Sequence, residues 1–344
     1  MTETARVGAK GLPGVRGRPF FGSALEFGKD PFAFFHAKYQ THGPVVRVRL
    51  LSIEPVMLLG PEANQPMRER ERSHMSARPA FERLGRAHFN AWSGVAALDA
   101  NARLKRLVEL AGRLVAAARA GALQSFVDLV LRAAGEGLLD EDDLLVSLLS
   151  PYFAGIDTVA GTLASGVCAL LGHEDVIGEL REELDLLGPG ELSDHRVLRR
   201  QLKLRAFVNE TLRRYPVSIL TLRQSIADID FSGHRVPPGT MLGFCTAFPH
   251  FMPEHFPEPD EFCLGRWLGG RPCPPNVFQP FGAGPHTCLG ASLAETQLLT
   301  TLAILVREYE PVLSRPGYVL KQKLDPLPRP YGMSVTLRRR ARSR

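Results

Sequence analysis

The feature that most restricts the fold is a glycine-rich segment with one cysteine, residues 280–290, directly before a long apolar stretch. Three glycines surround Cys288 in this segment, and glycine permits the close backbone approach and unusual dihedral angles that a tight loop needs. The apolar stretch predicts a helix over residues 288–309. The N-terminus of a helix stabilises a thiolate, because backbone N–H groups point at the sulfur. The segment therefore indicates a thiolate that binds iron.

The residues alone leave two other interpretations of Cys288 open. The first is a structural cysteine buried in a glycine-rich turn. The second is a zinc site built with upstream side chains, namely His250, His255, Cys263 and Cys273. The spacings of these four residues are five, eight and ten positions, and they match no compact zinc pattern.

The longest apolar stretch, residues 144–171, follows four acidic residues and predicts a helix. It is long enough to span a membrane, but Pro151 and Asp157 interrupt it. A helix that is apolar on all sides is more simply the buried central helix of a large domain, so we expect no membrane span. Thr158 can donate a hydrogen bond to the carbonyl of Ala154, four residues earlier, and open the helix locally.

The remaining patterns predict a mostly α fold with a small β region (α+β) in one domain over residues 1–344. The first 60 residues form a Pro-rich lead with a short antiparallel strand pair. Helices are expected after Asp30, where Pro31 suits the first position, and at residues 103–119, 125–134 and 197–215. Strands are expected at residues 46–50, 56–59, 219–222, 229–231 and 240–244. Leu204, Phe207, Val208 and Leu212 form the expected buried stripe of the 197–215 helix.

The cysteine segment resembles the F-x-x-G-x-x-x-C-x-G haem-binding signature of the cytochrome P450 family. Phe281, Gly284, Cys288 and Gly290 occupy its fixed positions. The resemblance implies a cytochrome P450-type fold in which residues 278–309 form the haem-ligand loop and the following helix. It also implies that Cys288 is the axial ligand of the iron of haem b (iron protoporphyrin IX), and that Phe281 and Gly282 lie against this cofactor.

Two cations are implied to serve the haem propionates. His286 stands in the signature where many family members have arginine. Arg223 follows the 197–215 helix on a strand, and it aligns with a family arginine that binds a propionate. A turn at residues 236–240 resembles the family's I/V-P-x-G-T element and supports this alignment.

The central helix carries a segment that resembles the A-G-x-D-T motif of the family. Gly155 lets a flat ligand approach the backbone. The resemblance places both Ala154 and Gly155 against the cofactor. Asp157 and Thr158 form an acid–alcohol pair that would deliver protons during oxygen activation. A structural ion pair and a helix-internal threonine are the alternative interpretation of these two residues.

A structural triad is implied by two further segments. Glu210 and Arg213 are spaced three residues apart on one helix, so their side chains share a face. The pair lies 75 to 78 residues before Cys288, where the family has its E-x-x-R pair. Arg266 lies in a segment that resembles the family's P-x-x-F…R element, whose arginine joins the pair. The triad would lock the irregular segment that precedes the cysteine loop.

The resemblance fails between about residues 78 and 125. The family has several more helices there than so short a segment can supply, and the fold is expected to lack them. One of these helices carries a W/H-x-x-x-R element whose arginine binds a propionate. Trp92 is present, but the position four residues later is Ala96. The resemblance therefore assigns no propionate-binding residue to this region.

Composition excludes several classes of protein. Five cysteines without a C-x-x-C pair argue against a disulfide framework and favour a reducing cytoplasm. The net charge of +6 is concentrated in the basic residues 338–344, which predict a solvated tail. No basic stripe with interleaved aromatic residues indicates a nucleic-acid partner. The polar first ten residues lack the apolar core of a signal peptide.

The function implied is monooxygenation, in which one atom of O2 enters an apolar small molecule and two electrons reduce the other atom to water. Residues 217–222 and 327–332 are expected to line the pocket with the central helix. The sequence has no flavin or iron–sulfur motif, so a separate donor such as a ferredoxin and its reductase is expected. The alternatives are an accessory haem-binding protein without oxygenase activity, or a haem-thiolate enzyme that uses peroxide or isomerises its substrate.

Overall fold

The computed structural model describes residues 11–15, 17–80, 109, 112–113, 126–188, 190–270, 273–315, 318, 321–324 and 327–341. The chain divides into two compact units: residues 1–81 with 159–344 form the larger one, and residues 82–158 form the smaller one. Trp92, Ala96 and nearly all of the helix expected at residues 103–119 lie outside the described residues. The prediction that the fold lacks several helices between residues 78 and 125 also concerns residues that are almost all outside the described part.

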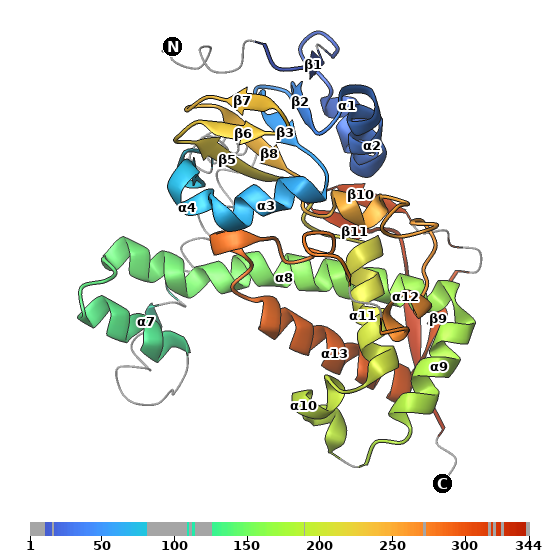
Figure 1. The fold of residues 1–344 in the computed structure, drawn as a ribbon. Coiled ribbons are helices and arrows are strands. Elements are labelled where there is room, and N and C mark those ends of the chain that lie inside the picture. Colours follow the sequence, from blue (N-terminus) through green and yellow to red (C-terminus); the bar gives the residue numbers. More distant parts are fainter. Residues whose placement is uncertain are drawn as a thin grey trace. The chain divides into compact units, whose positions relative to one another are not determined.

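A six-stranded sheet joins the N-terminal segment to residues from the second half of the chain (Figure 1). It contains β1 (Gly14–Val15), β2 (Val45–Val48), β3 (Val56–Leu58), β8 (Met241–Phe244), β5 (Thr221–Ser225) and β4 (Met75–Ser76), in this order. The antiparallel pair expected near the N-terminus is confirmed, with Val46 of β2 opposite Met57 of β3. β3 in turn pairs in parallel with β8. The sheet therefore fixes the early strands against β5, the strand that carries Arg223.

Short helices flank the sheet, and local sequence explains where they begin. They are α1 (Ala24–Lys29), α2 (Pro31–His42), α3 (Pro61–Glu69) and α4 (Glu71–His74). The carboxylate of Asp30 accepts hydrogen bonds from the N–H groups of Phe32 (3.1 Å) and Ala33 (2.9 Å), and Pro31 takes the first helical position of α2. This N-cap was predicted from the Asp-Pro pair, because both residues satisfy the needs of a helix start.

The helical part of the larger unit surrounds an apolar core of its own. Its helices are α9 (Glu174–Leu184), α10 (His195–Leu198), α11 (Leu202–Arg214), α12 (Gly265–Leu268) and α13 (Ala291–Glu308). α13 contacts α9, α10 and α11. The buried stripe expected on α11 is confirmed, since Leu204, Phe207, Val208 and Leu212 are all buried. These side chains pack against Leu298 and Leu302 of α13, so α11 and α13 share one core.

The structure differs from the expectation in one helix boundary and in elements that were not predicted. The helix expected at residues 197–215 is divided into α10 and α11, because Gln201 adopts an extended conformation and Leu202 begins a new helix. Helix α9 and the strand β7 (His234–Val236) were not predicted. β7 pairs with β6 (Ile229–Phe231). Two further antiparallel pairs join β9 (Tyr309–Leu313) to β12 (Val335–Arg339), and β10 (Gln322–Leu324) to β11 (Pro328–Pro330).

The smaller unit contributes α7 (Phe126–Gly135) and the first part of α8 (Glu141–Gly172). α8 contains the helix expected at residues 144–171 and extends it by one to three residues at its ends. By length and composition alone, Ala154–Gly172 could cross a membrane. In the larger unit, however, Ala169 and Leu170 are buried in the core shared with α11 and α13. This packing is what a central helix of a folded domain requires.

A buried ion pair holds the irregular residues between β8 and α13. The side chains of Glu210 and Arg213 are both fully buried. The guanidinium donates through Nε to Oε2 and through Nη2 to Oε1 of Glu210, each at 2.8 Å. Its remaining hydrogens go to the carbonyls of His250 (3.0 Å), Pro259 (2.8 Å) and Glu261 (3.0 Å). Arg213 thus binds three points of the irregular segment through one planar group.

The carboxylate of Glu210 is equally well supplied with donors. Arg266 donates to Oε1 at 3.3 Å, so the structure brings the three residues of the implied triad together. The backbone N–H of Cys263 also donates to Oε1 (3.0 Å), and the indole N–H of Trp267 donates to Oε2 (2.8 Å). Neither of these last two donors was expected from the sequence. A buried carboxylate with this many donors is stable, because its desolvation is offset on both oxygens.

We expect Glu210→Gln to lower the free energy of unfolding by about 3–5 kcal/mol, because Arg213 would remain buried without a counter-charge. Urea unfolding followed by circular dichroism measures the change. The matched control is Asp228→Asn, which removes the same charge from the bidentate but exposed pair of Asp228 with Arg235. An exposed pair contributes little, so equal effects of the two substitutions would contradict the structural role of Glu210.

Candidate functional site

Cys288 lies in the turn between a short 3-10 helix, Gly284–His286, and the start of α13. Its side chain is exposed. Its backbone N–H donates to the carbonyl of Phe281 (2.9 Å), which closes the loop. The sulfur therefore stands before the first turn of an 18-residue helix, where the N-terminal peptide dipoles stabilise negative charge. Cys288, Phe281, Gly282 and His286 are held together in this one loop.

Gly284 explains why the loop needs glycine. Its φ is +78°, in the left-handed region, and an added Cβ would lie 1.9 Å from the carbonyl oxygen of Met67. The cysteine loop is therefore seated directly on the backbone of α3. No other residue type fits this position without moving one of the two segments.

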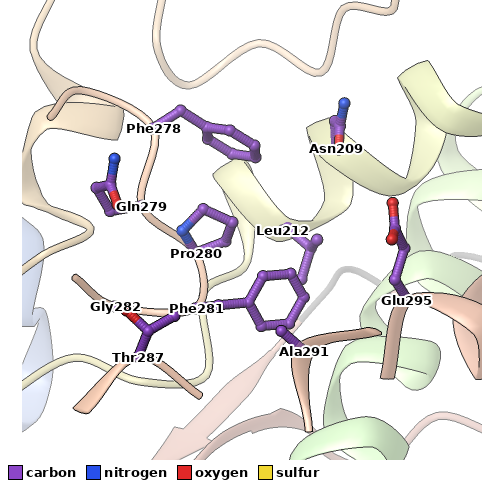
Figure 2. A pocket seen from close by; sticks show the side chains of 10 residues that line it. All are labelled: Asn209, Leu212, Phe278, Gln279, Pro280, Phe281, Gly282, Thr287, Ala291 and Glu295. Atoms are coloured by element: carbon purple, nitrogen blue, oxygen red, sulfur yellow. The ribbon is translucent and has the colours of Figure 1, made fainter. Parts of the chain in front are cut away.

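A cavity of about 340 Å³ lies on the α11 side of the loop (Figure 2). Figure 2 shows the Phe281 ring between Leu212 of α11 and Ala291 of α13. Glu295 and Asn209 supply polar groups to the lining. Phe281 thus connects the cysteine loop to the helical core, while the cavity leaves this side of the loop accessible.

A second cavity, of about 640 Å³, borders the two segments that were expected to line a substrate pocket. Ile219 of the first segment and Pro328 of the second lie in its wall, together with Phe32 and Phe251. The rings of Phe32 and Phe251 are stacked, with centroids 4.2 Å apart. The two expected segments therefore do come close to one another.

The two cations assigned to haem propionates converge on a residue that the sequence did not reveal. Arg223 of β5 is buried and forms an ion pair through Nε with Glu71 of α4. Nε2 of His286 lies 3.9 Å from the same carboxylate oxygen of Glu71. Arg223 and His286 are thus brought together, but a carboxylate of the chain stands between them. The alternating charges of residues 68–72 suggest a solvated face and give no sign that Glu71 is buried.

The motif residues of α8 lie in the smaller unit. The hydroxyl of Thr158 donates to the carbonyl of Ala154 (2.7 Å) and also approaches that of Gly155 (3.2 Å). The bond to Ala154 confirms the prediction from the spacing. The local opening of the helix is not found, because α8 remains continuous through both contacts. Asp157 is exposed, so its carboxyl group can exchange protons with solvent.

His250 connects the triad region to the cysteine loop. Its ring is fully buried, and Nε2 accepts a hydrogen bond from the backbone N–H of Gln279 (3.1 Å). Nδ1 therefore carries the proton, and it has no partner among the described residues. Burial and, to a smaller extent, the neighbouring charge of Arg213 together lower the pKa of His250 to about 3. The imidazole is neutral and holds the loop by accepting one backbone hydrogen bond.

The zinc interpretation finds no support in the described part of the chain. No group of three or more histidine, cysteine or acidic side chains there is arranged to hold a metal ion. The four residues considered for it, His250, His255, Cys263 and Cys273, are not gathered into one group.

Comparisons with known proteins agree with the geometry. A family model described as Cytochrome P450 matches residues 115–325, more than half of the chain. Sterol 14alpha-demethylase of Mycobacterium tuberculosis is 32% identical over 181 residues, which cover 51% of this chain and 40% of that protein. Cyclooctat-9-en-7-ol 5-monooxygenase of Streptomyces melanosporofaciens is 34% identical over 218 residues, covering 61% and 47% respectively. The matched part thus spans less than half of each curated relative.

Solved structures show the same fold at lower sequence identity. Retinoic acid-bound cyanobacterial CYP120A1 superposes with a TM-score of 0.75 at 20% identity, covering 95% of this chain and 99% of that chain. CYP102L1 gives a TM-score of 0.76 at 19% identity, with 96% and 99% covered. The mostly helical fold with a small β region that the sequence predicted is thereby confirmed.

The buried imidazole of His250 predicts acid sensitivity. The unfolded state binds a proton near pH 6.5, whereas the folded state does so only near pH 3. The contribution of His250 is therefore fully present above pH 6.5 and is lost as the pH falls below it, by about 1.4 kcal/mol per pH unit. Urea unfolding of the wild-type protein and of His250→Gln between pH 7 and pH 4 measures this slope, since glutamine can accept from Gln279 but does not titrate.

The control for this experiment is His195→Gln, because His195 is exposed. It should follow the wild-type pH profile, whereas His250→Gln should show a shallower one. A wild-type slope that persists in His250→Gln would assign the acid sensitivity to another group.

Proposed function

Because this chain belongs to the cytochrome P450 family, we propose that it is a haem-thiolate monooxygenase that inserts one atom of O2 into an apolar small molecule. The observation that carries this proposal is the exposed thiol of Cys288 before the first turn of α13, in a loop closed by its own N–H. The printed functions of two relatives, a sterol 14alpha-demethylase and a 5-monooxygenase, support oxidative chemistry on lipophilic compounds.

The residues around Cys288 fit haem b. The thiol is accessible, the loop is seated on α3 through Gly284, and Gly282 adds a second left-handed turn with a φ of +77°. Cys288 would bind the iron, Phe281 and Gly282 would lie against the ring, and Arg223 and His286 would serve its carboxylates. When bound, haem supplies the iron that activates O2, and a thiolate ligand donates electron density that favours O–O cleavage.

The proton supply is assigned to α8. The hydroxyl of Thr158 is oriented by the hydrogen bond that it donates to the carbonyl of Ala154. The exposed carboxyl group of Asp157 can take up a proton from solvent and pass it on through Thr158 Oγ1. Gly155, which has no Cβ, would allow the flat cofactor to approach the helix here, next to Ala154. An intact pair of this kind favours oxygen activation over a peroxide-dependent or isomerising reaction.

The substrate side of the pocket is assigned to residues 217–222 and 327–332 with the central helix. An added Cβ at Gly161 of α8 would lie 3.5 Å from the carbonyl oxygen of Pro328 and 3.6 Å from Cγ1 of Val217. Both segments therefore touch the helix in the larger unit. Such a lining suits an apolar small molecule bound mainly by shape.

Electrons would come from a separate protein, such as a ferredoxin with its reductase. The cavity between the cysteine loop, α11 and α13 leaves this side of the loop open to such a partner. All five cysteines are free, which agrees with a reducing cytoplasm. One domain over residues 1–344 would carry these functions.

A second candidate is an accessory haem-binding protein without oxygenase activity. The observation that favours it is that the chain matches less than half of the curated relatives. Reduction by a ferredoxin and ferredoxin reductase under air, with a panel of sterols, cyclic terpenes and fatty acids, separates the two candidates. Hydroxylated products support the monooxygenase, and reduction without any product supports the accessory protein.

We expect the purified, reduced protein to give the strongly red-shifted Soret band of a thiolate-ligated complex with carbon monoxide. Cys288→Ser should lose this band, because a serine hydroxyl cannot supply the thiolate. Cys263→Ser is the matched control, since Cys263 is also exposed and should keep the band. Absence of haem uptake by the wild-type protein, or an unchanged band in Cys288→Ser, would refute the proposed function.

Thr158→Ala should reduce product formation by about 10²-fold, as expected for loss of a positioned proton donor. Thr158→Ser keeps the hydroxyl and should restore most of the rate. The measurement is product formed per electron pair consumed, on whichever panel compound the wild-type protein oxidises. Equal coupling in the wild-type protein and in Thr158→Ala would remove Thr158 from the proton path.

A further inference from the structure

Glu71 is the buried member of an otherwise exposed charged run. Arg68, Glu69, Arg70 and Arg72 are all exposed, whereas Glu71 retains 2% of its accessible surface. A buried carboxylate costs free energy unless its oxygens receive hydrogen bonds. Its position therefore calls for a specific partner.

Arg223 is that partner, and the contact leaves one edge of the guanidinium available. Nε pairs with Oε1 of Glu71, and Nη1 donates to the carbonyl of Leu222 (2.8 Å). Nη2 donates to no residue in the described part of the chain. Arg223 is thus held at two points, while its third nitrogen can bind another carboxylate.

The second oxygen of Glu71 faces the cysteine loop. Oε2 is buried and has no hydrogen-bond partner among the described residues. It lies 2.9 Å from where a Cβ on Gly284 would be, so the carboxylate rests against the loop four residues before Cys288. A buried acceptor without a donor is a marked exception in a folded protein. It indicates a charge that is only partly compensated within the chain.

We propose that Glu71 is a positioning residue of the haem carboxylate site: it orients Arg223 through Nε and limits how tightly Arg223 holds a haem propionate. This inference rests on the proposed function. Glu71 and Arg223 already neutralise one another. A propionate on Nη2 would bring a second negative charge next to a carboxylate that burial leaves poorly screened. Removing the charge of Glu71 while keeping its acceptor should therefore strengthen the hold on haem.

The test compares Glu71→Gln with Glu69→Gln, an exposed position two residues away that loses the same charge. In the holoprotein, we expect Glu71→Gln to slow haem transfer to excess apomyoglobin by about tenfold. We also expect it to raise the midpoint potential of the iron, because a buried negative charge stabilises the ferric state. Glu69→Gln should change neither quantity. Faster haem loss in Glu71→Gln, or effects equal to those of Glu69→Gln, would overturn the proposal.

The cofactor-free protein should respond in the opposite direction. There, Glu71→Gln leaves Arg223 buried without a counter-charge, so the melting temperature should fall by about 2–4 °C. A double substitution with Arg223→Gln tests the connection between the two residues. When Arg223 is already glutamine, adding Glu71→Gln should no longer slow haem loss. If it still slows haem loss, Glu71 does not act through Arg223.

A measurement on the wild-type protein covers the case in which a variant does not fold. Haem and its dimethyl ester, which lacks the carboxylate charges, are loaded and their loss is compared. Because Glu71 already neutralises Arg223, we expect the ester to be lost at most about tenfold faster. Loss that is faster by orders of magnitude would assign Arg223 to the cofactor alone and refute the role of Glu71. Failure of the wild-type protein to bind haem would instead refute the proposed function, and the carbon monoxide spectrum records that outcome separately.

Discussion

The buried pair of Glu210 and Arg213 is the interaction on which the site depends. Between the end of β8 and the start of α13, the chain forms only short helical turns in the described residues. Such a segment has few internal hydrogen bonds and loses much conformational entropy when it is ordered. Arg213 binds three of its carbonyls, while Glu210 binds Arg266 and Trp267. The polar side chains of Glu210 and Arg213 on α11 thus take the place of the backbone hydrogen bonds that a helix or a sheet would provide.

The cysteine loop gains its rigidity from several such anchors. His250 accepts from Gln279 before the loop, Phe281 packs on the helical core within it, and Gly284 rests on α3. Each anchor comes from a different element, so the loop cannot shift without breaking contacts to all of them. This arrangement allows Cys288 to be exposed and still be held in one position, which a metal ligand needs.

The sequence predicted the parts of the fold that follow from local patterns. The buried stripe of α11, the N-cap of α2 and the bond from Thr158 to Ala154 all depend on spacing within a single helix. Helix α9 was missed, although Val176, Leu180 and Leu184 form a spaced apolar stripe. The burial of Glu71 and the indole N–H of Trp267 could not be predicted, because each depends on a partner far away in the chain. Tertiary contacts of single polar residues leave no periodic signal.

Glu71 and Glu210, the buried carboxylates in the described part of the larger unit, differ in how many hydrogen-bond donors they receive, and this difference separates a structural role from a functional one. Both carboxylate oxygens of Glu210 receive hydrogen bonds from groups of the chain. Glu71 has one oxygen paired with Arg223 and one without a donor. A buried carboxylate with a donor on only one oxygen is sensitive to a new charge nearby, because the groups of the chain do not fully stabilise its negative charge. The carboxylate beside the cysteine loop is therefore the one through which a bound cofactor and the chain can influence one another.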